Sequence, residues 1–457
     1  MNRGSLNAFR RRFGGELVAP ADEGYDDARR IWNAMFDRHP ALIVRPVDAA
    51  DVAAAIKFAR ESDLPIAVRS GGHSASGHST CDDGLVIDLS AMRGVNIDSD
   101  HRTARVNGGA LLRELDVAAQ AYGLVCPVGV VGHTGVAGLT LGGGFGRLQR
   151  RWGLTIDSVR SVELVTADGD LVRSSESEHP DLFWGMRGAG ANFGVATSFE
   201  FDLHPFDGGL TRGVRLYDAR DAVEVWPLVR QFAAIAPDHL SLTMGLGRAE
   251  PASDYPESVA GRPIFIVAFN HCGDASTVEA DTASLRAGPK PVSESIKQAR
   301  YLDIQAANDD AMGWGHRFDI MGAFADDLRP ATIEALVEHV AGAPPEASFG
   351  ITVQGGAISR VDDDATAFTG RTASLDVSAD AGWDDPTDDK KQIAWIRRAM
   401  AIVKPDTVPG RYVNEIADTG LEETRATYGD ATYERLAALK RDWDPTNVFR
   451  LNHNVEP

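Results

Sequence analysis

The sequence has few cysteines. Only Cys81, Cys126 and Cys272 occur in 457 residues, and no CxxC pair is among them. A disulfide framework needs more cysteines, and a zinc ribbon needs CxxC pairs, so both classes are excluded. We expect reduced thiols, a cytoplasmic location and no metal site.

Basic residues are also scarce. Lys and Arg together number 46, against 66 for Asp and Glu, and the net charge is −20. Nucleic acids and anionic membranes attract basic patches, so this balance argues against both as partners. An ordinary acidic cytosolic protein explains the charge better than adaptation to a salty environment does.

Long apolar runs are missing as well. No stretch of about 18 uncharged apolar residues occurs, so we expect no membrane-spanning segment. The basic run Arg10 to Arg12 leads into Phe13-Gly14-Gly15-Glu16 and not into an apolar segment, which argues against a signal peptide.

The chain does contain many short strand and helix patterns. Its length predicts two or three domains. Strand patterns occupy 41–44, 65–69, 85–89, 104–106 and 195–201, and helical spacing occupies 48–59 and 111–122, with Asp48 as a candidate N-cap. Residues 161–174 predict a hairpin around Asp168-Gly169.

The strand at 65–69 leads directly into the first of two glycine motifs, Arg69-Ser70-Gly71-Gly72-His73. Glycines at a strand end free backbone amides to face an anion, so the motif favours a diphosphate cradle. A tight loop with an incidental histidine explains the same residues equally well, because Gly-Gly turns are common.

The second motif is the glycine-dense run from Gly129 to Gly146. A regular helix or strand is costly for such a run, which is suited to laying backbone along a flat cofactor. Its glycines alternate with Val, Leu and Thr, unlike those of a flexible linker. The spacing in Gly142-Gly143-Gly144-Phe145-Gly146 is not the GxGxxG of a nicotinamide dinucleotide site.

With these residues placed, nearly the whole chain resembles the FAD-linked oxidases of the vanillyl-alcohol-oxidase type fold. The branch it resembles is the berberine-bridge-enzyme and 6-hydroxy-D-nicotine-oxidase group. Four blocks in order carry the resemblance: Val68–Ser74, Gly135–Gly146, Asp181–Trp184 with Arg187–Gly194, and Tyr412–Asn414 followed by Asp444–Asn454.

The resemblance implies an α+β fold. It has a two-part FAD-binding domain of the PCMH type and a substrate domain with an antiparallel sheet flanked by helices. We expect the FAD-binding domain at 1–205, the substrate domain at 206–403, and a C-terminal segment at 404–457 that returns to the FAD-binding domain.

The resemblance also implies covalent FAD. The family's tethering histidine matches His73, and the cysteine that adds a second bond in some members matches Val131, so we expect a single bond. Cys126 is then a buried small hydrophobe. The further residues expected to bind the cofactor are Arg69, Ser70, Gly71, Gly72, Ser74, Thr134, Gly135, Gly138, Gly142, Gly143, Gly144, Gly146, Val195, Tyr412, Asn414 and Asn452.

Three other histidines lie in the same motifs. For His78, His133 and His453, a loop histidine bonded to backbone explains each better than catalysis does. Thr134 matches the family position thought to control oxygen access, and its small side chain is compatible with that access.

Two departures from the family concern catalysis. Phe145 replaces the Tyr that assists deprotonation in the plant alcohol-oxidising members, and Glu415 follows Tyr412-Val413-Asn414 where those members have a second Tyr. Both departures argue against a simple monolignol-type alcohol oxidation.

No general base stands out in the sequence. Tyr412 and Asn414 are the better candidates to lie near the flavin. Alternation places Thr352 and Gln354 on one face of a strand at 348–354, and Asp376, Ser378 and Asp380 on one face of a strand at 373–381. Asp376 is a candidate catalytic residue, although the solvent face of an edge strand explains this alternation slightly better.

The expected reaction is hydride transfer from a small alcohol, amine, sugar or secondary metabolite to flavin N5. Molecular oxygen is the expected acceptor, giving hydrogen peroxide, in a monomer or homodimer. The alternatives are a dehydrogenase of the same fold with another acceptor and a non-catalytic flavin-binding protein.

Overall fold

A computed structural model describes residues 3–249 and 256–457. The first layer is a four-stranded sheet in the order β1-β2-β4-β3, formed by Glu16–Val18, Leu42–Arg45, Leu85–Asp88 and Ile66–Arg69. Helix α3 (Ala49–Glu61) connects β2 to β3, and the side chain of Asp48 caps it by accepting the Asp51 amide. Helices α1 (Arg3–Arg10) and α2 (Tyr25–Arg29) precede β2.

A second, antiparallel sheet follows in the order β5-β6-β10-β8-β9. Its strands are Val95–Asp98, Thr103–Asn107, Val195–Asp202, Val159–Val165 and Leu171–Ser175. The helices around it are α4 (Leu112–Gln120), α5 (Val136–Gly142), α6 (Gln149–Trp152) and α7 (Pro180–Ala189), and a short pair joins β7 (Leu124–Val125) to β11 (His204–Pro205). The predicted hairpin is confirmed as β8 and β9.

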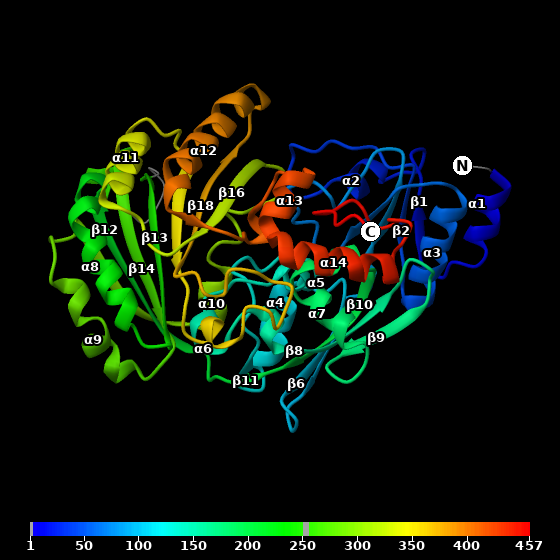
Figure 1. Ribbon diagram of the computed structural model, residues 1–457, viewed down its shortest axis with the longest axis horizontal. Coiled ribbons are helices and arrows are strands. Elements are labelled where there is room, and N and C mark those ends of the chain that lie inside the picture. Colours follow the sequence, from blue (N-terminus) through cyan, green and yellow to red (C-terminus); the bar gives the residue numbers. More distant parts are fainter. Residues whose placement is uncertain (1–2, 250–255) are drawn as a thin grey trace.

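The third sheet has eight strands in the order β15-β12-β14-β13-β17-β18-β16-β19. They are Ser293–Arg300, Gly209–Asp218, Pro263–His271, Leu240–Arg248, Ala347–Val353, Leu375–Trp383, Arg317–Ala325 and Thr407–Val408. Helices α8 (Ala222–Ile235), α11 (Pro330–Ala341) and α12 (Asp389–Val403) cover its outer face (Figure 1). The short helices α9 (Val278–Asp281) and α10 (Tyr301–Ala306) complete this region.

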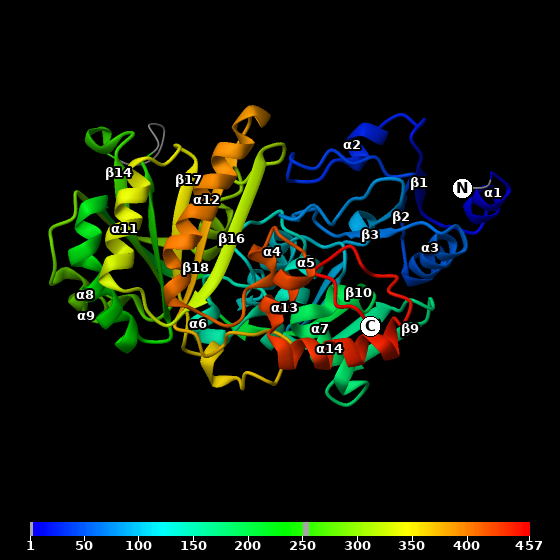
Figure 2. The ribbon, with the colours of Figure 1, turned by 45° about the horizontal axis from the view of Figure 1, so that its top comes forward.

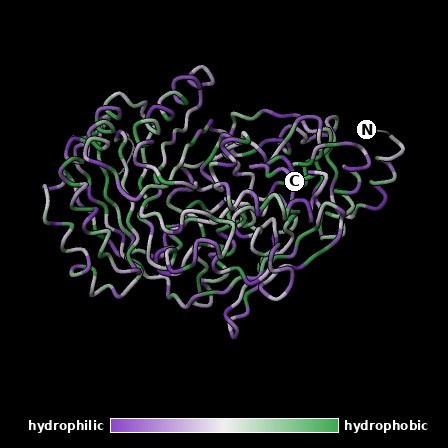
Figure 3. Tube along the Cα trace, viewed as in Figure 1, coloured by the Kyte–Doolittle hydropathy of each residue, from purple (hydrophilic) through white to green (hydrophobic). Residues whose placement is uncertain are grey.

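Period-two alternation gives the large sheet two different faces. Leu242, Met244 and Ile351 belong to the core beneath the covering helices. Ser241, Thr243 and Thr352, on the opposite face, line a cavity. Apolar segments run along the strands, and the outward turns are more polar (Figure 3).

The C-terminal part packs on the half of the molecule that contains the first two sheets. Helices α13 (Leu421–Tyr428) and α14 (Asp430–Trp443) contact each other, and α14 also contacts α7 (Figure 2). The tail is held by Lys440, whose buried ammonium donates to the carbonyls of Asn192 and Phe449 and pairs with Asp444 at 2.7 Å. No helix in the described ranges has the length and apolar character needed to cross a membrane.

The glycine-dense run differs from the expectation in one respect. Residues 136–142 form α5, whereas the glycine content of this run predicts that a regular helix is costly there. Packing outweighs the low helix propensity of glycine. Because Gly142 has no side chain, Asn414 packs close to it, and an added Cβ would lie 2.3 Å from Asn414 Oδ1. At Gly190 an added Cβ would lie 2.5 Å from Leu141 Cδ2.

The solvent-face explanation for β18 is wrong. The strand lies between β17 and β16 inside the sheet, where Asp376 is buried and Asp380 is half-buried. Strand order depends on contacts between distant segments, which a local alternation pattern does not contain.

Candidate active site

A cavity of about 560 Å³ lies where the two glycine motifs, the large sheet and the C-terminal tail meet. This size is typical of a site for a small molecule or cofactor. Most residues predicted to bind the cofactor line it: Ser70, Gly71, Gly72, His73, Ser74, Val131, Thr134, Gly135, Gly138, Gly146, Tyr412, Asn414 and Asn452.

Two predicted cofactor residues lie behind the cavity wall. Arg69 is buried with its guanidinium turned to Asp88 at 2.8 Å and to the carbonyls of Ala28 and Arg30. Val195 is fully buried in the core beneath the first sheet, and its neighbours Gly194 and Ala196 line the cavity instead. Arg69 therefore supports the loop that carries His73.

Three predicted glycines support the cavity without lining it. An added Cβ at Gly142, Gly143 or Gly144 would lie 2.2–2.7 Å from the side chains of Asn414, Phe368 or Thr155. These glycines allow close packing of the protein against itself. Gly138 differs, because it lines the cavity and an added Cβ would meet nothing within 4 Å, leaving open space for a cofactor.

His73 is held by two neighbouring rings. The Trp32 indole stacks on its imidazole with ring centroids 4.7 Å apart. Its Nε2 lies 2.5 Å from Nδ1 of His133, and Nε2 of His133 lies 3.1 Å from the carbonyl oxygen of Asp309. Burial and the adjacent His133 lower the pKa of His73 to about 3, so its ring is neutral at physiological pH.

This hydrogen-bond chain assigns a tautomer to each ring. A carbonyl oxygen only accepts, so Nε2 of His133 carries the proton and Nδ1 of a neutral His133 accepts. The donor to that nitrogen is then Nε2 of His73. The lone pair of His73 is left on Nδ1, which makes Nδ1 the nucleophilic nitrogen.

Polar groups without protein partners line the far part of the cavity. Among the described residues, His78 Nδ1, Ser79 Oγ, Asn452 Oδ1 and His453 Nδ1 are buried and have no hydrogen-bond partner within the protein. Buried polar atoms are normally satisfied, so this set fits a polar, extended ligand such as FAD. The backbone bond expected for His133 is confirmed by its contact with Asp309.

The two alternative anchor positions also differ. Val131 lines the cavity. Cys126 is fully buried in the core around the second sheet, where burial raises the pKa of its thiol, so the expected small hydrophobe is confirmed. All three cysteines are free.

Tyr412 and Asn414 hold the glycine loop in place. The Tyr412 hydroxyl oxygen accepts from the amides of Gly144 and Phe145 and from Asn414 Nδ2. Asn414 Nδ2 also donates to the Leu139 carbonyl in α5. Burial raises the pKa of Tyr412, so its phenol is a hydrogen-bonding group and not a base at neutral pH.

Sequence reasoning missed the role of Glu415. It lines the cavity, whereas Asp376, the predicted catalytic carboxylate, lies behind it. Burial raises the pKa of Asp376 to about 7, and burial together with the Asp376 charge raises the pKa of Glu415 well above its usual value. The pair therefore holds at least one proton at neutral pH. The sequence signal that could have indicated this role is the Glu at position 415, where the plant alcohol-oxidising members have a second Tyr.

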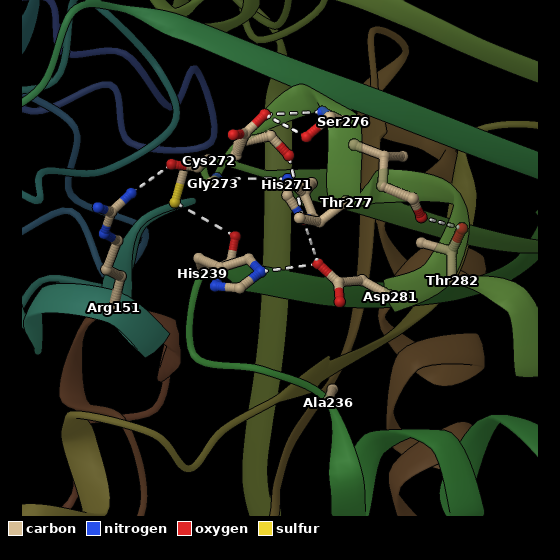
Figure 4. Close-up of polar contacts among 12 residues, drawn as sticks. Arg151, Ala236, His239, His271, Cys272, Gly273, Ser276, Thr277, Asp281 and Thr282 are labelled. Atoms are coloured by element: carbon tan, nitrogen blue, oxygen red, sulfur yellow. Dashed lines mark hydrogen bonds and ion pairs between the residues drawn. The ribbon is translucent and has the colours of Figure 1, made fainter.

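A separate cluster lies away from the cavity, at the ends of β13 and β14. Within the described ranges, His239, His271 and Asp281 are the one group placed to hold a metal ion (Figure 4). Nε2 of His271 and Nε2 of His239 both approach Asp281 Oδ2, at 2.8 and 3.0 Å. The Gly273 amide donates to His271 Nδ1, which leaves the proton of a neutral ring on Nε2. In that tautomer Nε2 of His271 donates its proton to Asp281 and has no lone pair for a metal ion. These contacts therefore describe a hydrogen-bonded cluster.

The fold and this cavity define a class of protein, and similarity to known proteins agrees. Residues 40–175 match the FAD binding domain family and residues 411–456 match the berberine and berberine-like family. The chain belongs to the FAD-linked oxidoreductases of the berberine-bridge-enzyme and 6-hydroxynicotine-oxidase group.

Individual relatives cover almost the whole chain. It is 30% identical to (R)-6-hydroxynicotine oxidase of Paenarthrobacter nicotinovorans, over 97% of each chain. The crystal structure of 6-hydroxy-D-nicotine oxidase from Arthrobacter nicotinovorans superposes with a TM-score of 0.85 at 29% identity, covering 97% of this chain and 98% of that one. A berberine-bridge-enzyme-like protein of Physcomitrella patens shares the fold, with a TM-score of 0.89 at 24% identity over 99% of both chains.

Proposed function

We propose that this chain is an oxidase whose FAD is covalently bonded to one residue, His73, through the Nδ1 atom of its ring. Its substrate is a small alcohol, amine, sugar or secondary metabolite, and its electron acceptor is oxygen, which leaves as hydrogen peroxide. The hydrogen-bond chain from Asp309 through His133 to His73 carries this proposal, because it directs the lone pair of His73 to Nδ1.

Bound FAD supplies a two-electron acceptor for a hydride from the substrate. The protein supplies position and proton transfer. The Ser70–Ser74 loop, Gly138 and the tail residues Asn452 and His453 would hold the cofactor. Glu415 faces the cavity and accepts the proton of a substrate hydroxyl or amine, while Asp376 behind it sets the charge of the pair.

Support for oxygen as acceptor comes from the relatives. Proteins that cover nearly the same length are named as oxidases. The small side chain of Thr134 in the cavity wall is compatible with oxygen access. Peroxide release under air distinguishes an oxidase from a dehydrogenase, which would reduce only a dye.

Acid precipitation tests the tether. We expect a yellow pellet and a flavin mass on the peptide that contains residue 73, both lost in His73→Ala. In His133→Leu, Nε2 of His73 loses its acceptor, so we expect the covalently bound fraction to fall several-fold while free FAD still binds. His101→Ala, at an exposed turn, is the matched control and keeps the wild-type fraction. A colourless wild-type pellet, or a yellow pellet from His73→Ala, contradicts the proposal.

A further inference from the structure

One part of the cavity wall is rich in hydrogen-bond donors. Arg147 and Gln149 come from the segment around α6, and Asn270 and Ser241 come from β14 and β13. Helix α6 contacts β13, and Ser241 pairs with Asn270 across the sheet, so these residues form one continuous region. It lies apart from Glu415 and Asp376, because β17 separates β13 from β18.

Both amide side chains have their oxygen atoms engaged. The Gly146 amide donates to Gln149 Oε1 at 2.9 Å, and Arg212 donates to Asn270 Oδ1 at 3.3 Å. An amide whose oxygen is engaged offers its NH₂ group to other partners. Two buried amides in one wall that are both fixed as donors favour an acceptor ligand.

Arg147 adds a positive charge to these donors. One terminal nitrogen donates to the Ile304 carbonyl at 3.1 Å, and within the described part of the chain Arg147 forms no ion pair. Burial and the neighbouring Arg212 lower the pKa of Arg147 to about 10, so the guanidinium is still charged at neutral pH. Asp116, the carboxyl nearby, already accepts from Tyr301 and Gln305.

The basic character continues along the sheet. Arg212 on β12 is paired in register with Asn270 on one side and with Lys297 on the edge strand β15 on the other. A row with two basic residues therefore leads from the exposed edge to the cavity, in a chain whose net charge is −20. Arg147 has no anionic partner among the described residues, and the cost of leaving its charge unpaired favours a ligand of opposite charge.

We propose that Arg147, Asn270 and Gln149 form a subsite for a carboxylate on the substrate. The inference rests on the proposed function, since it names the substrate class of the same cavity. Arg147 pairs with the carboxylate, and the two NH₂ groups donate to its oxygens. The oxidised hydroxyl or amine belongs to another part of the substrate, which faces Glu415.

Ligand titration of the FAD-loaded protein tests the subsite. The probes are 4-phenylbutanoate and 4-phenylbutanamide, which match in size and differ in charge, and the readout is the perturbed flavin absorbance. We expect the acid to bind wild type at least tenfold more tightly than the amide. Charged hydrogen bonds contribute roughly 1.5–3 kcal/mol, and about 1.4 kcal/mol corresponds to tenfold.

Three variants sharpen the test. Arg147→Met should remove the preference for the acid, and Arg147→Lys should keep most of it. Asn270→Asp still accepts from Arg212 but places a negative charge at the subsite, so it should weaken the acid at least tenfold and leave the amide unchanged. Arg160→Met, an exposed arginine on β8, is the control and should match wild type.

The outcomes separate the two proposals. Equal binding of acid and amide to wild type, or an undiminished preference in both Arg147→Met and Asn270→Asp, overturns the subsite. A yellow acid pellet together with that result leaves the tether intact. A colourless pellet with a clear preference for the acid supports the subsite and overturns only the tether.

Discussion

At the scale of single residues, the site depends on where protons lie. The carbonyl of Asp309 is an acceptor only, and its position two hydrogen bonds away decides which nitrogen of His73 is nucleophilic. Glu415 and Asp376 are both buried, so the two carboxyls are not both ionised at neutral pH. Neither arrangement is visible in a local sequence motif, because each joins segments far apart in the chain.

Glu415 gives the first of three further predictions. If Glu415 accepts the substrate proton, kcat/KM rises with pH as Glu415 loses its proton, in a range well above the usual pKa of a glutamate. Glu415→Gln should lower kcat/KM by roughly 10²–10⁴ and abolish that rise. Asp376→Asn should move this rise to lower pH, because removing the neighbouring charge lowers the pKa of Glu415.

The control for this measurement is Glu434→Gln, an exposed glutamate on α14. Steady-state kinetics over pH 5.5–9.5 provides the readout. A Glu415→Gln variant with the wild-type rate and pH profile contradicts the assignment of Glu415 as the proton acceptor.

At the scale of elements, local patterns predicted most strands and helices. The runs at 41–44, 85–89 and 195–201 became β2, β4 and β10 within one residue, because β-branched apolar residues favour strands. Helix α5 was not predicted, since its stability comes from packing against α7 and Asn414. The central position of β18 was also missed, because it is set by pairing with β16 and β17.

The C-terminal helix α14 gives the second prediction. Lys440→Met leaves Asp444 buried without its cation, and Asp444 also caps the amides of Val448 and Phe449. Loss of one partner of a buried pair costs about 3–5 kcal/mol, so we expect a decrease of that size in the free energy of unfolding. Urea denaturation measures it, and exposed Lys391→Met is the control. Equal stability of the two variants contradicts the structural role of this ion pair.

At the scale of the whole molecule, buried carboxyls and buried histidines have opposite effects on how stability depends on pH. Burial raises the pKa of Asp116 to about 7 and lowers the pKa values of His73 and His453 to about 3. The buried carboxyls lower the free energy of unfolding as pH rises from about 4 to 7. The buried histidines raise it as pH rises to about 6.5. The contributions of the two kinds of group therefore oppose each other in this range.

Removing one buried carboxyl exposes the underlying dependence. Asp116→Asn is neutral at every pH, so its melting temperature should exceed that of wild type by an amount that grows between pH 4 and 7 and is constant above pH 7. About 1.4 kcal/mol per pKa unit sets the scale. Thermal melts at pH 5 and pH 8 measure the difference, and Asp100→Asn, at an exposed turn, is the control. A difference that does not change with pH contradicts this account.

The family and the fold class followed from four motifs in order, and similarity to known proteins confirms both. The cavity-lining glycines were predicted because backbone shape near a cofactor restricts residue type, and His73 was predicted because it matches the family's tethering histidine. Arg147 and Glu415 were not assigned roles, because Arg147 lies just outside the Gly135–Gly146 block and Glu415 was noted only as a departure from the family. The domain limits at 205 and 403, the cytoplasmic location and the oligomeric state stay predictions.

The composition of the cavity wall has a consequence for biosynthesis. The wall includes Ser70 to Ser74 near one end of the chain and Asn452 and His453 near the other. A ribosome that has just made the histidine loop has not yet made the residues that close the cavity over it. The wall around a flavin is therefore complete only after translation has passed residue 453.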